Sequence, residues 1–166
     1  MEHLDVLGPG DAGEMLTLQR AAYVTEAQAH GDVFLPPPRQ SLAELYAELE
    51  DPDVVALGWR SDGGRLVAAG RAHIIHGANA AEIGRLTVVP DLQGQGLGTS
   101  LILAIEERLP TDVQELRLFT GERSEANLRL YARLGYSEVE REPTPEGYAL
   151  VHLCKARGTA TRSEAP

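Results

Sequence analysis

A glycine-rich segment between a predicted strand and a predicted helix constrains the fold of this chain most strongly. Residues 82–89 carry mostly apolar, branched side chains, as a buried strand does, and a proline ends the run. Three glycines follow at Gly94, Gly96 and Gly98. An apolar stripe at three- and four-residue spacing then predicts a helix over residues 97–109. Strand, glycine turn and helix together favour an anion site, because glycines let backbone N–H groups point outward at the positive helix end.

The segment does not fit two well-known phosphate-binding loops. A P-loop ends in Gly-Lys-Ser/Thr, and no lysine is present here. The dinucleotide fingerprint Gly-x-Gly-x-x-Gly needs its third glycine one residue after Gly98. Residues 93–98, which read Gln-Gly-Gln-Gly-Leu-Gly, do match the pattern Gln/Arg-x-x-Gly-x-Gly/Ala. In this the segment resembles the pyrophosphate loop of the GNAT family of N-acetyltransferases.

A second stretch further along the chain resembles the same family. Residues 116–120 are similar to the family's next strand. Residues 127–136 then follow its helix pattern Asn-x-x-x-Tyr-x-x-x-Gly-Phe/Tyr, with Asn127, Tyr131 and Gly135 in register. Both signatures occur in the order that the family requires, and together they cover about residues 80–140.

The resemblance implies an α/β (α+β) fold, the acyl-CoA N-acyltransferase fold. It has a mixed, mostly antiparallel sheet of about seven strands and about four flanking helices. In that fold two parallel strands splay apart at one end, and the pantetheine arm of the cofactor lies in the gap. Residues 54–60, 65–76 and 82–89 are predicted to form an antiparallel meander, and residues 116–120 a strand parallel to its predecessor.

Length and local signals complete the predicted organisation. The chain has 166 residues, which suits one domain, expected over residues 1–155, with residues 156–166 as a disordered tail. Two capping boxes are predicted to open helices, with N-caps at Asp11 and Ser41. The second helix should turn its apolar residues inward: Leu42, Leu45, Tyr46 and Leu49.

The composition excludes several other classes of protein. A formal charge of −10 argues against a nucleic-acid partner, because phosphate contacts need clustered Lys and Arg. The single cysteine, Cys154, rules out an internal disulfide and a cysteine-rich metal site, and no metal is expected. No apolar run is long enough to span a membrane, and the first residues lack the basic start of a signal peptide. A cytoplasmic protein without membrane contact is therefore expected.

The resemblance implies that acetyl-CoA is the co-substrate. The loop amides and the helix dipole would hold its pyrophosphate, and Asn127 would hydrogen-bond the pantetheine arm. A backbone N–H near a bulge around Val88 and Val89 would polarise the thioester carbonyl. The hydroxyls of Thr99 and Ser100 are either further donors or ordinary first-turn residues. The full set of residues implied to bind the cofactor is Leu86, Val88, Val89, Gln93, Gly94, Gln95, Gly96, Leu97, Gly98, Thr99, Ser100 and Asn127.

The resemblance also implies which residues carry the chemistry. Tyr131, one helical turn after Asn127, would act as the general acid towards the departing thiolate. Glu82 is the candidate base, and strand alternation would place it on the face of Leu86 and Val88. The alternatives to Glu82 are His73, His76 and solvent, and Tyr148 is a candidate for the acceptor pocket.

The predicted function is direct acetyl transfer from acetyl-CoA to a primary amine through a ternary complex. The acidic balance favours a small cationic acceptor, and a protein N-terminus or lysine is the second option. A non-catalytic acyl-CoA-binding module and a protein that keeps only the fold are the other readings. Family members are often dimers, so a homodimer stays open. Arg85 is a charge inside an apolar strand, so it must be paired or reach the surface of the sheet.

Overall fold

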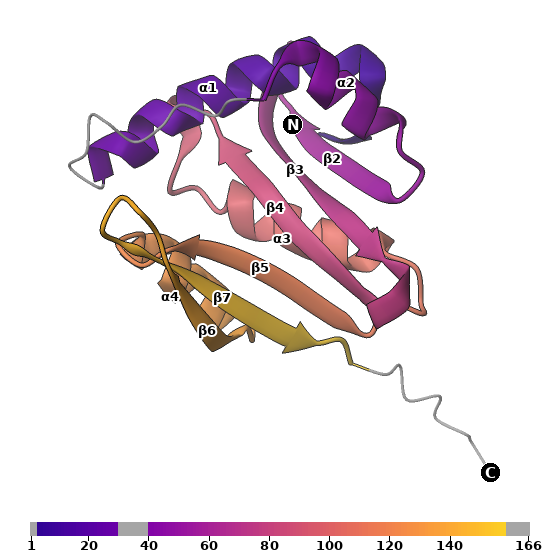
Figure 1. The fold of residues 1–166 in the computed structure, drawn as a ribbon. Coiled ribbons are helices and arrows are strands. Elements are labelled where there is room, and N and C mark those ends of the chain that lie inside the picture. Colours follow the sequence, from indigo (N-terminus) through magenta and orange to yellow (C-terminus); the bar gives the residue numbers. More distant parts are fainter. Residues whose placement is uncertain (1–2, 30–39, 159–166) are drawn as a thin grey trace.

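A computed structural model describes residues 3–29 and 40–158, and it confirms the predicted fold class. The described part contains seven strands, four α-helices and three short 3-10 turns, arranged as an α/β fold (Figure 1). In chain order these are β1 (His3–Val6), η1 (Pro9–Asp11), α1 (Ala12–Ala29), α2 (Leu42–Glu50), β2 (Val54–Arg60), β3 (Leu66–Ile75), η2 (His76–Ala78), β4 (Ala80–Val88), η3 (Pro90–Leu92), α3 (Leu97–Arg108), β5 (Glu115–Gly121), α4 (Glu125–Arg133), β6 (Ser137–Pro143) and β7 (Ala149–Ala156).

One sheet contains all seven strands, in the spatial order β1-β2-β3-β4-β5-β7-β6. Every neighbouring pair is antiparallel except β4 and β5, which are parallel because α3 makes the crossover between them. Their pairing is short: it covers Ala80 with Glu115, Ala81 with Leu116 and Glu82 with Arg117. Beyond Glu82 the two strands diverge, as Figure 1 shows.

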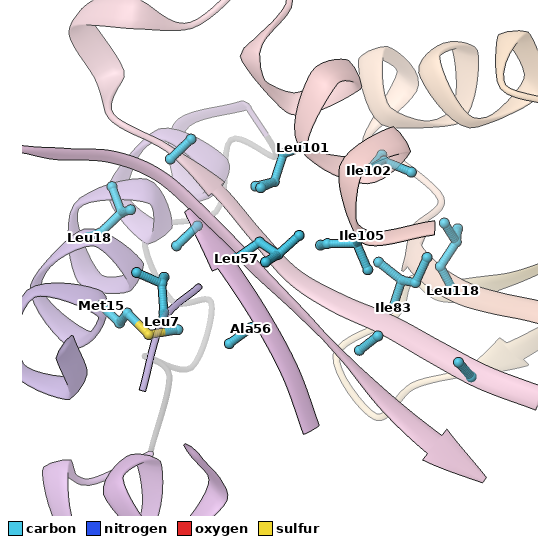
Figure 2. Packing of buried hydrophobic residues seen from close by; sticks show 14 of the residues in the cluster. Leu7, Met15, Leu18, Ala56, Leu57, Ile83, Leu101, Ile102, Ile105 and Leu118 are labelled. Carbon is cyan, nitrogen blue, oxygen red and sulfur yellow. The ribbon is translucent and has the colours of Figure 1, made fainter. Parts of the chain in front are cut away.

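The helices cover both faces of the sheet and enclose its core. Helices α1 and α2 pack on β2, β3 and β4 from one side, and α3 packs on the same strands from the other (Figure 1). Met15 and Leu18 lie on the α1 side, while Leu101 and Ile105 of α3 lie on the opposite side (Figure 2). Because α3 is anchored by its buried stripe, the glycine segment before it is held in a fixed place at the end of β4.

Of the two predicted capping boxes, the structure contains one. The Ser41 hydroxyl accepts a hydrogen bond from the Glu44 N–H at 3.1 Å, and the Glu44 carboxylate accepts from the Ser41 N–H at 2.7 Å. At the start of α1 the box with Asp11 as N-cap is wrong. Asp11 ends η1, accepts from the Gly8 N–H and pairs with Arg60 at 2.8 Å. The mostly buried guanidinium of Arg60 pairs with this carboxylate, which local sequence spacing does not reveal.

Two further sequence predictions change in the structure. Only Leu45 and Leu49 of α2 are buried, while Leu42 and Tyr46 are about half exposed, so the inward stripe is narrower than predicted. At the other end of the chain, β7 runs to Ala156, and Arg157 donates hydrogen bonds to carbonyls at the end of α3. The rest of the predicted tail, residues 159–166, and the predicted proline-rich connection lie outside the described residues.

Strand β4 carries a bulge that reverses its face alternation. Ala69 pairs with Thr87 but Arg71 pairs with Gly84, so Arg85 and Leu86 together oppose Gly70. Arg85 takes a left-handed backbone conformation with φ of 53°.

The bulge assigns the residues on its two sides to opposite faces. Direct cross-strand partners share a face, so Glu82 lies with His73 on the side of α1 and α2. Leu86 packs over Gly70 beside the α3 side chains. Val88 pairs with Ala68 on that same face. The prediction that Glu82 shares a face with Leu86 and Val88 is therefore wrong, because the extra residue shifts the alternation.

We expect Gly58→Ala to destabilise the sheet. A Cβ at this position in β2 would lie 2.9 Å from the backbone carbonyl oxygen of Ala68, which is fixed in the ladder. Overpacking of this kind costs about 1–3 kcal/mol of unfolding free energy. Urea unfolding measures it, with Gly63→Ala in the exposed hairpin as the control, since a Cβ there meets nothing within 4 Å. Equal stability of Gly58→Ala and wild type would contradict the close approach.

Candidate active site

A cavity of about 620 Å³ lies where β4 and β5 diverge. Its walls come from both halves of the sheet and from helices on both faces, so it passes through the gap between the two strands. The side chains that matter for chemistry here are Glu48, His73, Glu82, Arg85, Asn127 and Tyr131. Elements far apart in the sequence thus meet around one space, as a site for two substrates requires.

The structure brings some of the predicted site residues into this cavity and leaves others beside it. Glu82, Leu86, Asn127 and Tyr131 line it, and so does the acceptor-pocket candidate Tyr148. The remaining predicted cofactor contacts are outside the cavity lining, at the end of β4 and the start of α3: Val88, Val89, Gln93, Gly94, Gln95, Gly96, Leu97, Gly98, Thr99 and Ser100.

The glycine segment has the backbone geometry of an anion site. Gly94 and Gly96 have φ of 77° and 85°, which side-chain-bearing residues rarely adopt, and Gly96 is the N-cap of α3. The first N–H of α3 that finds a backbone acceptor is that of Ser100, which donates to Gly96. Among the described residues, the amides from Gly94 to Thr99 therefore have no backbone acceptor. These amides and the positive end of the helix dipole favour a bound phosphate.

The end of β4 differs from the sequence prediction in one respect. The Val89 N–H donates to the Val67 carbonyl at 2.9 Å, so it is already used within the sheet. The bulge is at Arg85 and Leu86, so the predicted bulge around Val88 and Val89 is wrong. By alternation the backbone groups of Val88 point away from β3, towards the gap. The side-chain amide of Gln93 donates a hydrogen bond to the Val88 carbonyl at 3.1 Å and so connects the loop to the strand.

Helix α4 presents Asn127 and Tyr131 to the cavity one turn apart. The Asn127 amide lies 3.4 Å from the hydroxyl oxygen of Thr120 at the end of β5, which is a long hydrogen bond. Tyr131 is almost fully buried and packs edge-on against Tyr136, with 6.2 Å between ring centroids. Gly135 ends the helix with φ of 93°, as the sequence predicts for its C′ residue.

A buried polar cluster between α1, α2 and β3 forms one wall of the cavity. Arg71 is 1% exposed, and its guanidinium bonds to both carboxylate oxygens of Glu48, at 2.6 and 3.1 Å. The side-chain oxygens of Gln19 and Gln40 accept from its two terminal nitrogens, at 2.8 and 2.9 Å. His73 completes the cluster, with its Nε2 2.7 Å from Glu48. Each nitrogen of the Arg71 guanidinium therefore has a hydrogen-bond acceptor, as a buried charge needs.

The sequence predictions missed this cluster. Burial alone would raise the pKa of Glu48, but the hydrogen bonds and the charge of Arg71 outweigh it, so the carboxyl pKa lies below its ordinary value. The only local signal is that Arg71 interrupts the apolar run of β3. Its partner Glu48 is 23 residues away on α2, so no short motif links the two.

The three candidates for the base occupy different places. Glu82 and His73 are direct partners across β4 and β3, and both line the cavity. His76 pairs with Asp53 at 2.7 Å and is not among the lining residues. The geometry leaves Glu82 and His73 as the side chains that can reach an acceptor in the cavity.

Comparison with known proteins agrees with the fold. The model of the acetyltransferase (GNAT) family matches residues 18–136, so the chain belongs to this family. The family uses acetyl-CoA as its co-substrate. No curated protein sequence matches the chain. None of the described helices is long and apolar enough to cross a membrane.

Several solved structures share the architecture. One is a candidate acyl-CoA N-acyltransferase from Klebsiella pneumoniae, 28% identical, with a TM-score of 0.67 over 94% of this chain and 97% of the other. The ribosomal-protein-S18-alanine N-acetyltransferase from Escherichia coli is 19% identical, with a TM-score of 0.75 and full coverage of both chains. A spermidine N-acetyltransferase chimera from Vibrio cholerae and hSSAT is 16% identical, with a TM-score of 0.73 over 93% and 95%. At such identities the last two speak for the fold alone.

We expect Gly96→Ala to weaken the binding of coenzyme A. A side chain at φ of 85° costs about 1–2 kcal/mol, so the loop must shift and carry its amides away from their present directions. The dissociation constant should rise about tenfold. It can be measured from the dependence of the melting temperature on coenzyme A concentration. Gly10→Ala, outside the site, is the control, and an unchanged constant in Gly96→Ala would refute the role of the loop.

We expect Glu48→Gln to destabilise the protein near neutral pH by on the order of 3 kcal/mol, because Arg71 loses its buried partner charge. The folded-state pKa of Glu48 is below the ordinary 4.5, so this stabilisation is present above that pH. It is lost as the pH falls through the folded pKa, and the difference from wild type should shrink there. Urea unfolding at neutral pH and at a pH below the folded pKa of Glu48 tests this, with the exposed Glu50→Gln as control. A constant difference across pH would contradict it.

Proposed function

We propose that this protein transfers an acetyl group from acetyl-CoA directly to the primary amine of a small molecule. The observation that carries the proposal is the alignment of three features along one gap. The first is the set of backbone N–H groups of Gly94–Thr99, which have no backbone hydrogen-bond acceptor among the described residues. The second is the edge of β4 that faces β5 and is no longer paired with it, and the third is the cavity lined by Tyr131. An elongated ligand with a phosphate group at one end and a reactive group at the other matches that arrangement.

The residues present fit acetyl-CoA, which supplies a thioester whose carbonyl carbon accepts the amine. The amides from Gly94 to Thr99 would hold its pyrophosphate, with Thr99 and Ser100 in the first turn of α3 beside them. The backbone groups of Val88 and the Asn127 side chain would bind the pantetheine arm along the gap. This set follows the contacts that the family resemblance implies, with three residues left out. The Val89 N–H is bonded to Val67, the Leu86 side chain packs over Gly70, and the Gln93 side chain donates to the Val88 carbonyl.

The protons of the reaction can be assigned to side chains of the cavity. As the nitrogen–carbon bond forms and the carbon–sulfur bond breaks, the Tyr131 hydroxyl would give its proton to the departing thiolate. A phenol and an alkyl thiol have comparable pKa values in general, so this transfer is feasible. The proton of the amine would pass to Glu82 or His73, directly or through water, because both face the cavity as cross-strand partners.

The cavity bears on the charge of the acceptor. The preference for a cationic acceptor rested on the net charge of −10. The cavity lining has no excess of negative charge, because it contains two glutamates, Glu48 and Glu82, and two arginines, Arg71 and Arg85. A small molecule is our first choice. The structural neighbours with spermidine and a ribosomal protein in their names keep a polyamine and a protein N-terminus as alternatives to be tested.

We expect Tyr131→Phe to lose most of the turnover while still binding coenzyme A. Removing a general acid costs about a hundredfold or more in kcat. A free-thiol assay with acetyl-CoA against amino acids, polyamines, aminoglycosides and short peptides measures it. Thermal stabilisation by coenzyme A reports binding separately.

Tyr136→Phe is the matched control, since Tyr136 bonds to Glu106 at 2.6 Å and is not a lining residue. It should turn over nearly as wild type. Full activity of Tyr131→Phe would remove this residue from the chemistry. Stabilisation by coenzyme A without turnover of any amine would instead favour a binding module.

A further inference from the structure

The charges of the cavity fall into two groups. Glu48 and Arg71 neutralise one another through two hydrogen bonds, Gln19 accepts from the remaining terminal nitrogen of the arginine, and Gln40 accepts from the terminal nitrogen that also bonds Glu48. The charges of this pair are thus already balanced within the protein. Glu82 and Arg85 are different: both are exposed into the cavity, and neither has an ion-pair partner within 4 Å among the described residues.

Arg85 lines the cavity at the bulge of β4. It precedes Leu86 on β4, at the point where β4 has already separated from β5. Its charge is close enough to lower the pKa of Arg71, after the larger effect of burial. Since Glu48 already satisfies Arg71, a second anion beside Arg85 would relieve this repulsion. None of the ion pairs within 4 Å among the described residues includes Arg85.

The backbone at this position does not favour arginine. A residue with φ of 53° is most easily a glycine, and an arginine with this backbone conformation is strained. The chain therefore has a side chain, that of Arg85, at a strained backbone position in the cavity wall. Local conformational preference gives no reason for the arginine, whereas its guanidinium supplies a fork of donors that suits a carboxylate.

We propose that the acceptor is an amine that also carries a carboxylate or a similar anionic group, which Arg85 binds within the cavity. The ammonium end of such a molecule then faces the carboxylate of Glu82, three residues earlier on β4. Glu82 lies opposite Arg117 in the β4–β5 pairing without an ion pair within 4 Å, and Arg85 has no such pair among the described residues. This anion and this cation on one strand complement a zwitterion of the amino-acid type. The inference rests on the proposed acetyl transfer and names the class of its acceptor.

The test compares acceptors that differ only in the anionic group. L-amino acids with different side chains are each assayed beside their own carboxamide, in which the amine is kept and the carboxylate is removed. Wild type should show a kcat/KM at least about tenfold higher for the acid than for the amide of any accepted side chain. Arg85→Gln should lower the value for the acid by about the same factor and leave the amide within about twofold. Arg85→Lys should fall between them, because it keeps the charge but loses the fork.

Arg141→Gln is the matched control, since it removes one positive charge from the edge strand β6, outside the cavity. It should leave the preference for the acid intact. Equal turnover of acid and amide by wild type, or an equal loss for both in Arg85→Gln, would overturn the proposal.

A second readout separates this proposal from the transfer itself. N-acetylated amino acids and their amides are added with coenzyme A, and the melting temperature is followed. If no amine is acetylated, the proposed function fails. Stabilisation by the acid form alone, lost in Arg85→Gln, would still support the anion site. Stabilisation by neither form, or equally by both, would overturn it.

Discussion

The pairing between β4 and β5 ends after Glu82 and Arg117, and the rest of the site depends on that early end. A parallel pair that continued would fill both strand edges with hydrogen bonds and leave no path through the sheet. Because β7 covers the far edge of β5 and β3 covers the far edge of β4, only the inner edges are open. The gap then receives side chains from both faces: Tyr131 from α4 and Glu48 from α2. At the end of this gap the glycine loop leads into α3, so the phosphate site and the cavity both lie along the gap.

The bulge at Arg85 and Leu86 determines what the gap contains. Without the extra residue, strand alternation would place Leu86 on the face of Glu82, and β4 would present a plain apolar edge. With it, Leu86 joins the core over Gly70, and Arg85 is left facing the cavity. Glu82 stays beside His73 on the face of the sheet that α1 and α2 cover. A single inserted residue thus separates the apolar packing of α3 from the polar chemistry on the other face.

The sequence was sufficient for features that depend on neighbours along the chain. The Gly94–Gly98 loop, the Asn127–Tyr131 helix and the meander of strands were predicted, because positive φ, helical spacing and hairpin turns leave local signals. Three of the failures share one cause. Asp11 pairs with Arg60 of a distant strand, and Glu48 pairs with Arg71. The bulge in β4 is defined by its pairing with β3. A buried guanidinium takes whichever carboxylate the fold brings to it, and the sequence distance between the two hides the pair.

The central claim is that the open edges of the β4–β5 gap and the glycine loop form one coenzyme A site. It is tested most directly by amide NMR spectra of the labelled protein during titration with coenzyme A. The account predicts large, saturable shifts for the amides of Gly94–Thr99, Val88 and Asn127, which lie on separate elements along the gap. Saturable shifts that map instead to the opposite end of the sheet, around Glu115 and Cys154, or no shifts at millimolar coenzyme A, would contradict it.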